Sequence, residues 1–425
     1  MDLIDLKGKR VLVGITGSIA AYKACELVRL FVKSGARIYV VMSEAATKFI
    51  SPLTFEALTR NKVLTQESED WSSECNHIDY AQKSDAFVIA PATANTINKL
   101  AKGIADTLLL QCALAFDKNL VIAPAANSKM LENHYTAGSL KMLAVNDIEI
   151  VSPTRKLLAC GDEGNGALAE VKDIYYTTVK TILKDPFWSD RRVVVTGGGT
   201  REAIDSVRFI GNHSSGKMAN ALATALYLKG ADVCLITTKK SDNIPKDIYT
   251  IEVEDAKEML EYTIDAIRVA KKGKMSKASM NSSESIHLIQ KKPYLFMAAA
   301  VADYTPKYPQ NGKLKKSTLG KEWQLELSQT QDILKNINKD GLITIGFKAE
   351  KDPSSALENA KRALQEKGLD AICLNILGEK NNFGSDYNKV TCFTKNSSYE
   401  LPLKPKIDLS FDILNIVKKL DRDEQ

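Results

Sequence analysis

Two glycine-rich turns have the composition of phosphate-binding loops. Residues 14–23 (GITGSIAAYK) join an apolar run to a segment of helical length, and residues 196–200 (TGGGT) follow a second apolar run. Small residues let backbone N–H groups approach a phosphate, and the N-terminus of a following helix adds a favourable dipole. Residues 214–216 (SSG) precede another helical segment and predict a second anion site in this half of the chain.

Side chains that can move protons or charge stand near these turns. His77 lies near the start of a predicted helix, Asn127 follows the fourth apolar run, and Cys160 lies in a Gly-rich loop. Taken singly, a histidine or cysteine is more often a structural residue than a functional one. In the second half, Asp303 ends a strand, where a carboxylate can hold Mg²⁺ on a triphosphate, and Lys313 can neutralise charge on a leaving pyrophosphate.

The elements that position these groups are those of an α/β protein. In the first half, apolar runs alternate with helical segments such as residues 19–33, a pattern typical of a parallel sheet covered by helices. These runs span residues 11–15, 37–42, 86–90 and 120–123. The pattern restarts at residue 193, after a polar segment with a proline. Its later runs are DVCLIT, YLFMAAAV, LITIGF, DAICLNI and VTCFT.

We therefore expect two doubly wound, mainly parallel Rossmann-like domains. The polar segment places their boundary near residue 188, so the domains span residues 1–188 and 189–425. A Lys- and Ser-rich stretch near residues 271–292 is predicted to be an insertion in the second domain.

The composition excludes several classes of protein. The chain has 425 residues, 44% hydrophobic and 26% charged, which rules out a disordered or fibrous chain. Its 58 Lys and Arg against 52 Asp and Glu give a net charge of +6, but both signs are interspersed, so we expect no nucleic-acid partner. No apolar run approaches the ~20 residues that span a bilayer. Seven cysteines without a CxxC pair, and only four histidines, indicate a reduced, cytoplasmic enzyme without a zinc site.

An NAD(P)-dependent oxidoreductase is one alternative, because two α/β domains with Gly-rich turns suit a dinucleotide. However, neither turn has the GxGxxG spacing. The second strand of each half ends in Met42-Ser43 or in residues 236–239 (ITTK), not in the acidic residue that holds an NAD ribose. A Walker loop is absent as well, because Met218 follows Gly216-Lys217. These features disfavour a dinucleotide.

The first half resembles the homo-oligomeric flavin-containing cysteine decarboxylase family. The matching motifs are residues 17–23 (GSIAAYK), 77–78 (HI), 91–97 (PATANTI), 124–130 (PAANSKM) and 159–161 (ACG). The resemblance implies a flavodoxin-like domain in which His77 is catalytic, Asn127 grips the substrate carboxylate and Cys160 supplies the proton that completes reduction of the enethiol. Oxidation of the substrate thiol carbon by a flavin creates the electron sink that decarboxylation requires.

The same resemblance implies the contacts of FMN and of the substrate. The implied FMN contacts are Gly17, Ser18, Ile19, Ser43, Ala92, Thr93, Ala94 and Asn95. Met130 joins Asn127 at the substrate. Two departures from the family pattern occur, because Ala126 replaces the usual Met and Ala167 replaces an Arg of the flap. Neither residue is a chemical group of the reaction, so we expect an altered grip on the substrate and not a loss of activity.

The second half resembles phosphopantothenate–cysteine ligases. The matching motifs include residues 196–223, 298–304 (AAAVADY), 313–316 (KLKK), 330–334 (TQDIL) and 346–350 (GFKAE). The resemblance implies activation of 4′-phosphopantothenate by CTP to an acyl-cytidylate, followed by attack of the cysteine amine. Asn212 then holds the acyl-cytidylate, Lys313 aids its formation, and Asp303 contacts Mg²⁺ or the nucleotide. The implied CTP contacts are Met297, Ala298, Ala299, Asp303, Lys313, Gln331, Asp332, Ile333, Leu334, Phe347 and Lys367.

The second half also departs from its family pattern. The departures are Gly199, Gly211, Gln331 and Ala363, together with the insertion near residues 271–292. A neighbouring Lys361 or Arg362 can substitute for the family lysine that falls on Ala363. The preference for CTP over ATP comes entirely from the resemblance.

Taken together, the two halves resemble the bifunctional decarboxylase–ligase family of coenzyme A biosynthesis along nearly the whole chain. That family implies decarboxylase trimers, ligase dimers and a large homo-oligomer such as a dodecamer. It implies FMN and Mg²⁺ as cofactors, and 4′-phosphopantothenate, cysteine and CTP as substrates. The second alternative is a non-catalytic flavoprotein of the same fold, which would have no need of His77, Asn127 and Cys160.

Overall fold

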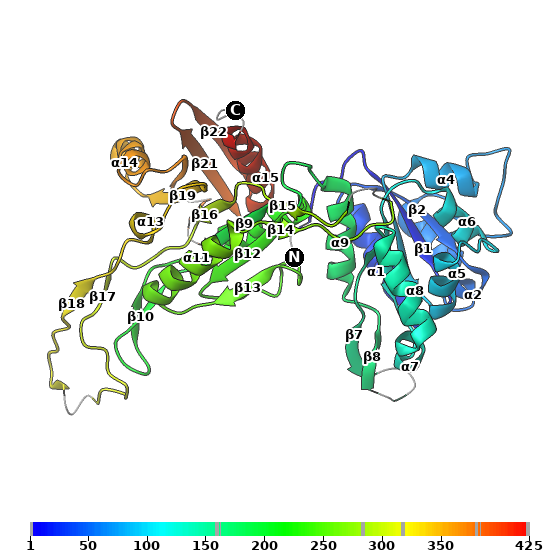
Figure 1. The fold of residues 1–425 in the computed structure, drawn as a ribbon, viewed down its shortest axis with the longest axis horizontal. Coiled ribbons are helices and arrows are strands. Elements are labelled where there is room, and N and C mark those ends of the chain that lie inside the picture. Colours follow the sequence, from blue (N-terminus) through cyan, green and yellow to red (C-terminus); the bar gives the residue numbers. More distant parts are fainter. Residues whose placement is uncertain are drawn as a thin grey trace. The chain divides into compact units, whose positions relative to one another are not determined.

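The structure is a computed structural model that describes residues 3–157, 161, 163–281, 285–315, 319–378, 381–382 and 384–421. The chain divides into two compact units, which we describe separately (Figure 1). The first unit comprises Met1–Lys184 and Ser276–His287, and the second comprises Asp185–Met275 and Leu288–Gln425.

The first unit is built on a six-stranded parallel sheet. Its strands are β1 (Arg10–Ile15), β2 (Arg37–Met42), β3 (Val63–Leu64), β4 (Ala86–Ala92), β5 (Leu120–Pro124) and β6 (Glu149–Ile150). Their order in the sheet is β3-β2-β1-β4-β5-β6, and each neighbouring pair is parallel. This order confirms the Rossmann-like prediction, whereas a flavodoxin-like sheet has the order 2-1-3-4-5. The difference arises because the short β3 pairs with the outer edge of β2.

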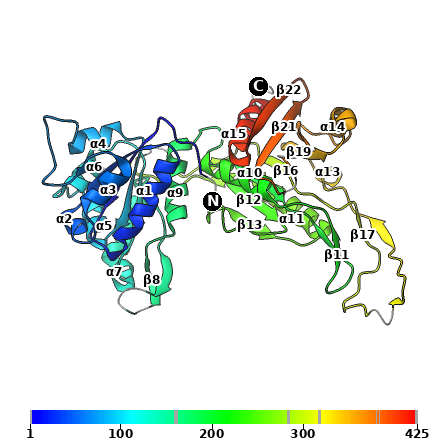
Figure 2. The ribbon, with the colours of Figure 1, turned by 180° about the vertical axis from the view of Figure 1, so that it is seen from behind.

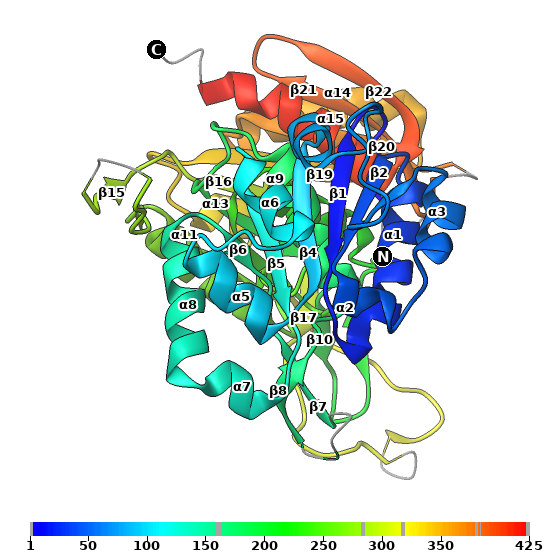
Figure 3. The same ribbon diagram turned by 90° about the vertical axis from the view of Figure 1, so that its right-hand side faces the viewer.

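Helices cover both faces of this sheet (Figure 3). One face packs against α1 and α9, and the opposite face packs against α4 and α6. The predicted helix over residues 19–33 begins as a 3₁₀ turn, η1, whose first N–H groups are capped by Ser18. The helical elements are η1 (Ile19–Tyr22), α1 (Lys23–Lys33), α2 (Glu44–Thr47), α3 (Pro52–Thr59), α4 (His77–Lys83), α5 (Ala94–Ala101), α6 (Leu108–Ala115), α7 (Ser128–Glu132), α8 (His134–Val145) and α9 (Val171–Leu183).

A hairpin and an inserted segment complete the first unit. Strands β7 (Thr154–Leu157) and β8 (Glu163–Ala167) pair antiparallel. The segment Ser276–His287 lies within the sequence of the second unit but packs with the first. The N–H of Met280 donates to the carbonyl oxygen of Val145 at 2.8 Å, and the Ser279 hydroxyl donates to Asp147 at 2.6 Å. The polar insertion is therefore anchored at the end of α8.

The second unit is built on an eight-stranded sheet. Its order is β13-β12-β9-β16-β19-β20-β21-β22, which is parallel up to β20 and antiparallel beyond it. These strands are β9 (Arg192–Gly197), β12 (Asp232–Thr237), β13 (Tyr249–Glu252), β16 (Tyr294–Met297), β19 (Ile343–Glu350), β20 (Ala371–Ile376), β21 (Tyr387–Thr394) and β22 (Ser398–Pro405). A mainly parallel sheet was expected, and the structure confirms it.

The helices of the second unit also lie on both faces of its sheet. One face packs against α10 (Lys217–Leu228) and α15 (Lys406–Val417), and the other against α11 (Ala256–Ala270) and α14 (Pro353–Glu366). Two shorter helices of the described residues are α13 (Ile333–Asn336) and η2 (Lys418–Asp421). None of the helices in the described part of the chain is long and apolar enough to cross a membrane.

Two ribbons of the second unit extend away from its main sheet (Figure 2). They consist of β10 (Arg201–Ala203) with β11 (Phe209–Gly211), and of β17 (Tyr304–Pro306) with β18 (Leu327–Gln329), and β10 packs beside β17. A third short ribbon pairs β14 (Lys274–Met275) with β15 (Leu288–Ile289).

Arg191 anchors the C-terminal end of the second unit. Its side chain is 5% exposed, donates to the carbonyl oxygen of Lys292 at 2.6 Å and pairs with Asp421 at 2.9 Å. The guanidinium also lies 3.9 Å from the centroid of the Phe187 ring. We expect Arg191→Ala to lower the free energy of unfolding of this unit by about 1–3 kcal/mol, because the carbonyl oxygen of Lys292 and the half-buried carboxylate of Asp421 lose their donor. Urea unfolding measures this value.

The neighbouring Arg192→Ala is the matched control. The Arg192 side chain is 26% exposed, lies 3.5 Å from Asp232, which is 39% exposed, and donates to the carbonyl oxygen of Val269 at 2.6 Å. Because these groups are more exposed than the Arg191 side chain, we expect a loss of about 0–1 kcal/mol. An equal loss of stability in both variants would contradict the anchoring role of Arg191.

Candidate functional sites

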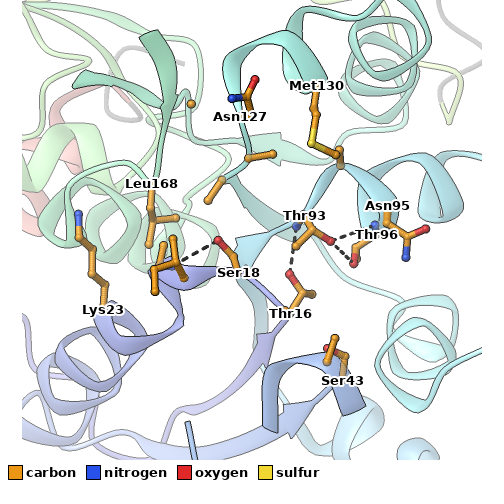
Figure 4. A pocket seen from close by; sticks show the side chains of 18 of the residues that line it. Thr16, Ser18, Lys23, Ser43, Thr93, Asn95, Thr96, Asn127, Met130 and Leu168 are labelled. Carbon is orange, nitrogen blue, oxygen red and sulfur yellow. Dashed lines mark hydrogen bonds between the residues drawn. The ribbon is translucent and has the colours of Figure 1, made fainter. Parts of the chain in front are cut away.

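A large cavity opens at the carboxyl end of the first unit's sheet. Its volume is about 1010 Å³, and it lies where the strand order reverses between β1 and β4 (Figure 4). Open α/β sheets bind their ligands at this switch point. The cavity is lined by Thr16, Gly17, Ser18, Ile19, Ala20, Tyr22, Lys23, Ser43, Glu44, Ala45, Thr93, Ala94, Asn95, Thr96, Lys99, Thr107, Leu109, Leu110, Ala125, Ala126, Asn127, Met130, Lys156, Leu157, Gly166, Ala167 and Leu168.

Hydroxyl side chains at the strand ends shape the polar part of this cavity. The Ser18, Ser43 and Thr93 hydroxyls cap the helices that follow β1, β2 and β4. Each of these cap residues has an extended backbone, and the helix begins at the next residue. All but one of the predicted FMN residues line the cavity. The exception is Ala92, which is buried at the end of β4.

The predicted substrate residues line the same cavity. Asn127 caps α7 by accepting the Lys129 N–H at 2.9 Å, and Met130 follows one helical turn later. The departures Ala126 and Ala167 are lining residues as well. The Ala126 N–H donates to the carbonyl oxygen of Gly166 at 3.2 Å, which ties the β7–β8 hairpin to the substrate loop. Cys160 lies outside the described residues.

His77 is the one described catalytic candidate of this unit that is not among the described lining residues of the cavity. It is the first residue of α4, whose N-terminus is capped by Asn76. Its Nδ1 atom lies 2.7 Å from Oε1 of Glu69, and both side chains are less than a fifth exposed. The ring of Trp71 meets the imidazole edge-on, with the centroids 5.4 Å apart, and Trp71 is 66% exposed.

Three of the predicted nucleotide residues, Met297, Ala298 and Phe347, lie at the carboxyl end of β16 and in the adjoining part of β19. Met297 ends β16 and pairs in register with Thr196 of β9 and Gly346 of β19. Phe347 is the next residue of β19 and is half-buried. Ala298 follows Met297, and its N–H donates to the carbonyl oxygen of Thr196 at 3.2 Å. These residues lie where the strand order reverses between β9 and β16.

Asp332 and Lys367 form an ion pair at 2.9 Å. Burial alone would raise the pKa of Asp332, but the Lys367 ammonium beside it holds that pKa below its ordinary value. The two residues come from different elements, since Asp332 caps α13 and Lys367 ends α14. The neighbouring Ile333 and Leu334 side chains are buried in the hydrophobic core, so only their backbone is available to a ligand.

Asn212 is held beside the segment that follows β16. Its Nδ2 atom donates to the carbonyl oxygen of Val301 at 2.9 Å. Asp303 is exposed on the same segment, and its carbonyl oxygen accepts the Thr330 N–H at 2.9 Å. Asn212 and Asp303 thus come from segments that lie side by side.

The loop that carries Lys313 is fixed at its next residue, Leu314. The Leu314 N–H donates to Asp205 at 3.1 Å, and its carbonyl oxygen accepts from Arg208 at 2.6 Å. Burial would raise the pKa of Asp205, but three backbone N–H donors and the Arg208 charge lower it. Asp205 is therefore an ionised carboxylate that ties Lys313's loop to the β10–β11 ribbon.

The glycines of the TGGGT turn are required by the protein's own packing. A Cβ at Gly197 would lie 2.4 Å from Cβ of Ala219 on α10, and one at Gly199 would lie 2.4 Å from the carbonyl oxygen of Asn212. Gly198 has a φ of +81°, which disfavours any other residue. The turn thus brings the Asn212 segment and the start of α10 against the end of β9.

Several residues of these sites escaped the sequence analysis. Glu69 lies eight residues before His77, and no local spacing rule links a loop carboxylate to the first residue of the next helix. The hydrogen bonds of the Thr16 and Thr196 hydroxyls also join segments that only the fold brings together. The only sign of them in the sequence was a polar residue at the end of the first strand of each unit.

The comparisons with known proteins agree with this division of sites. Residues 3–183 match the Flavoprotein family, and residues 188–278 and 263–420 match the DNA/pantothenate metabolism flavoprotein C-terminal domain. The chain is 37% identical over 423 residues to the coenzyme A biosynthesis bifunctional protein CoaBC of Haemophilus influenzae, covering 97% of this chain and 98% of that protein. The chain belongs to the CoaBC family.

Another CoaBC protein, from Bacillus subtilis, is 37% identical over 426 residues and covers 98% of both chains. A crystal structure of the C-terminal domain of a CoaBC protein aligns with 56% of this chain and all of its own, at 31% identity and a TM-score of 0.43. Membership of the CoaBC family makes the chain a bifunctional enzyme of coenzyme A biosynthesis, with ligase and decarboxylase activities. The Flavoprotein match shows that its cofactor is a flavin. The NAD(P)-dependent and non-catalytic alternatives are set aside.

Proposed function

We propose that residues 1–188 perform the FMN-dependent decarboxylation of 4′-phosphopantothenoylcysteine to 4′-phosphopantetheine. Residues 189–425 perform the preceding CTP-dependent ligation of cysteine to 4′-phosphopantothenate through an acyl-cytidylate. The observation that carries the proposal is the 1010 Å³ cavity, in which the turn after β1 and the predicted substrate residues Asn127 and Met130 line one space.

The cavity suits FMN in its chemistry. One part carries the hydroxyls of Ser18, Ser43 and Thr93, which together with backbone N–H groups suit a phosphate and a ribityl chain. Another part carries leucine side chains, among them Leu109 and Leu168, which suit a flat apolar ring system. Bound FMN supplies the electron acceptor and donor for the thiol carbon of the substrate.

The chain's own residues bind the substrate and move its protons. Asn127 orients the carboxylate that leaves as CO₂, and Cys160 returns a proton to the reduced product. His77 takes up or orients the thiol proton. Since His77 does not line the described cavity of its own chain, we propose that a second copy of the chain brings its histidine to this cavity. We propose a homo-oligomer with the decarboxylase trimers and ligase dimers that the family resemblance implies.

Glu69 fixes the orientation of His77. A carboxylate that accepts the Nδ1–H leaves the Nε2 atom as the acceptor that faces the substrate. We expect Glu69→Gln to lower kcat for decarboxylation by about 10-fold with little change in KM, because its amide holds the ring less firmly. The tautomer is read from the ¹⁵N chemical shifts of His77. The matched control is Glu67→Gln, two residues earlier, and an unchanged tautomer and kcat in Glu69→Gln would exclude this role.

The ligase roles follow the same strand-end geometry. Asn212 holds the acyl-cytidylate, and Lys313 neutralises charge on the leaving pyrophosphate. The residues Met297 to Ala299, Gln331 to Leu334, Phe347 and Lys367 hold CTP. No group of three or more His, Cys, Asp or Glu in the described part of the chain is arranged as a metal site. We propose that Asp303 contacts Mg²⁺ together with the nucleotide phosphates.

Flavin titration tests the proposal for the first unit. Purified full-length chain is expected to bind one FMN per chain, and Ser18→Phe, which fills the lining of the cavity, is expected to prevent binding. Glu26→Phe, at another position of the same chain, is the control. Binding of FMN to Ser18→Phe with unchanged affinity would show that the flavin lies elsewhere.

A further inference from the structure

A buried threonine stands at the switch point of each unit. In the first unit the strand order reverses between β1 and β4, and in the second between β9 and β16. Thr16 directly follows β1 and is 1% exposed, and Thr196 lies in β9 and is fully buried. The two residues thus occupy equivalent places in two separate sheets.

Thr16 joins two loops of the first cavity. Its Oγ1 atom donates to the carbonyl oxygen of Pro91 at 2.7 Å. The same atom accepts the N–H of Thr93 at 3.0 Å (Figure 4). Thr93 is the cap of α5 and lines the cavity. One hydroxyl therefore fixes the path of the chain from the end of β4 into α5.

Thr196 makes the equivalent pair of contacts in the second unit. Its Oγ1 atom lies 3.1 Å from the Met297 sulfur, to which it donates, and accepts the N–H of Ala299 at 3.3 Å. Thr200 makes a similar contact, because its Oγ1 accepts the N–H of Ala302 at 2.9 Å. The loop after β16 is thereby held at two points.

The position of these hydroxyls has a physical cause. At a switch point the helices that follow the two strands leave toward opposite faces of the sheet, so the ladder of backbone hydrogen bonds between the strands becomes incomplete. In the second unit the N–H groups of Ala298 and Ala300 still donate to the carbonyl oxygens of Thr196 and Gly198, whereas the Ala299 N–H between them donates to the Thr196 hydroxyl. An N–H group that the ladder leaves out needs another acceptor, because a buried N–H without a partner is costly. A threonine hydroxyl supplies that acceptor and donates in turn to the adjacent strand.

We propose that Thr16 and Thr196 are positioning residues, which hold the FMN-binding and nucleotide-binding loops in their binding conformations. Thr16 acts through Pro91 and Thr93, and Thr196 acts through Met297 and Ala299. The proposal rests on the proposed function, because that function places FMN and CTP at these loops. Each threonine therefore affects the affinity for the ligand of its own unit and not for the ligand of the other unit.

Two pairs of variants of the full-length chain test this proposal. Valine has nearly the shape of threonine but lacks the hydroxyl, whereas serine keeps it. We expect Thr16→Val to raise the Kd for FMN by about tenfold or more, as expected when a buried N–H loses its acceptor, and Thr16→Ser to change it by less than about threefold. Release of FMN from the diluted holoprotein is followed by flavin fluorescence.

Thr196→Val and Thr196→Ser form the reciprocal pair. We expect Thr196→Val to weaken CTP binding, measured by calorimetry, by about tenfold or more, while its affinity for FMN stays that of the wild type. Thr16→Val in turn keeps the wild-type affinity for CTP. Each valine variant is thus the folding control for the other. If Thr16→Val does not fold, Thr16→Ala removes the same hydroxyl with less crowding.

Three results would overturn the inference. They are wild-type binding by both valine variants, equal weakening of both ligands by one variant, and weakening by serine as large as that by valine. A wild-type chain that binds no FMN would instead contradict the proposed function. The two failures are therefore distinguishable in one set of titrations.

Discussion

His77→Ala is expected to lower the rate of decarboxylation by about 10²–10⁴-fold, the usual contribution of a positioned acid or base. The variant should keep its FMN, because His77 is not among the described residues that line the cavity. Ligation should also continue, so phosphopantothenoylcysteine accumulates. Product analysis of a single reaction mixture measures both effects.

The matched control for this variant is His134→Ala. His134 begins α8, is exposed and stacks on the ring of Tyr135 with the centroids 4.2 Å apart. A decarboxylation rate within about threefold of the wild type is expected for it. If His77→Ala decarboxylates as fast as His134→Ala, the histidine has no part in the reaction. If it loses FMN, its role is structural.

Asn212→Asp is expected to lower the rate of ligation by about 10²–10³-fold. The side-chain amide donates to the carbonyl oxygen of Val301 at 2.9 Å, and a carboxylate cannot make this bond. The substitution also places a negative charge at the proposed site of a polyphosphate. Decarboxylation of added phosphopantothenoylcysteine should be unchanged, since that reaction belongs to the first unit.

Asn338→Asp provides the matched control for the ligase variant. Asn338 is exposed, and its Oδ1 accepts the Asp340 N–H at 2.9 Å, an interaction that aspartate retains. We expect wild-type ligation from it. Rapid-quench analysis of Asn212→Asp shows whether acyl-cytidylate accumulates. Unaltered ligase turnover in this variant would remove Asn212 from the reaction.

Many of the strands, and the polar residues that follow them, could be predicted because local patterns of apolar residues determine them. The apolar runs that end at Ile15 and Met42 were expected as buried strands, and parallel strands present their ends at one edge. The expected run YLFMAAAV was too long, because β16 ends at Met297. The residues of the first cavity were predictable for the same reason. Ser43 and Thr93 follow β2 and β4 directly, and Ser18 lies three residues after the end of β1.

The contacts between distant segments could not be predicted. Asp332 and Lys367 are 35 positions apart and meet because α13 begins beside the end of α14, which no sequence period reveals. Ile333 and Leu334 matched a family motif, yet the core holds their side chains. Likewise, the polar composition of residues 271–292 indicated an insertion but not that Ser279 would bond to Asp147.

One measurement tests the central claim that a single chain performs both reactions. The purified protein is incubated with FMN, 4′-phosphopantothenate, cysteine and Mg²⁺, with CTP or ATP in parallel, and the products are identified by mass spectrometry. We expect 4′-phosphopantetheine with CTP, and far less of it with ATP. If neither phosphopantothenoylcysteine nor 4′-phosphopantetheine forms with either nucleotide, although flavin is bound, the chain does not perform the two proposed reactions.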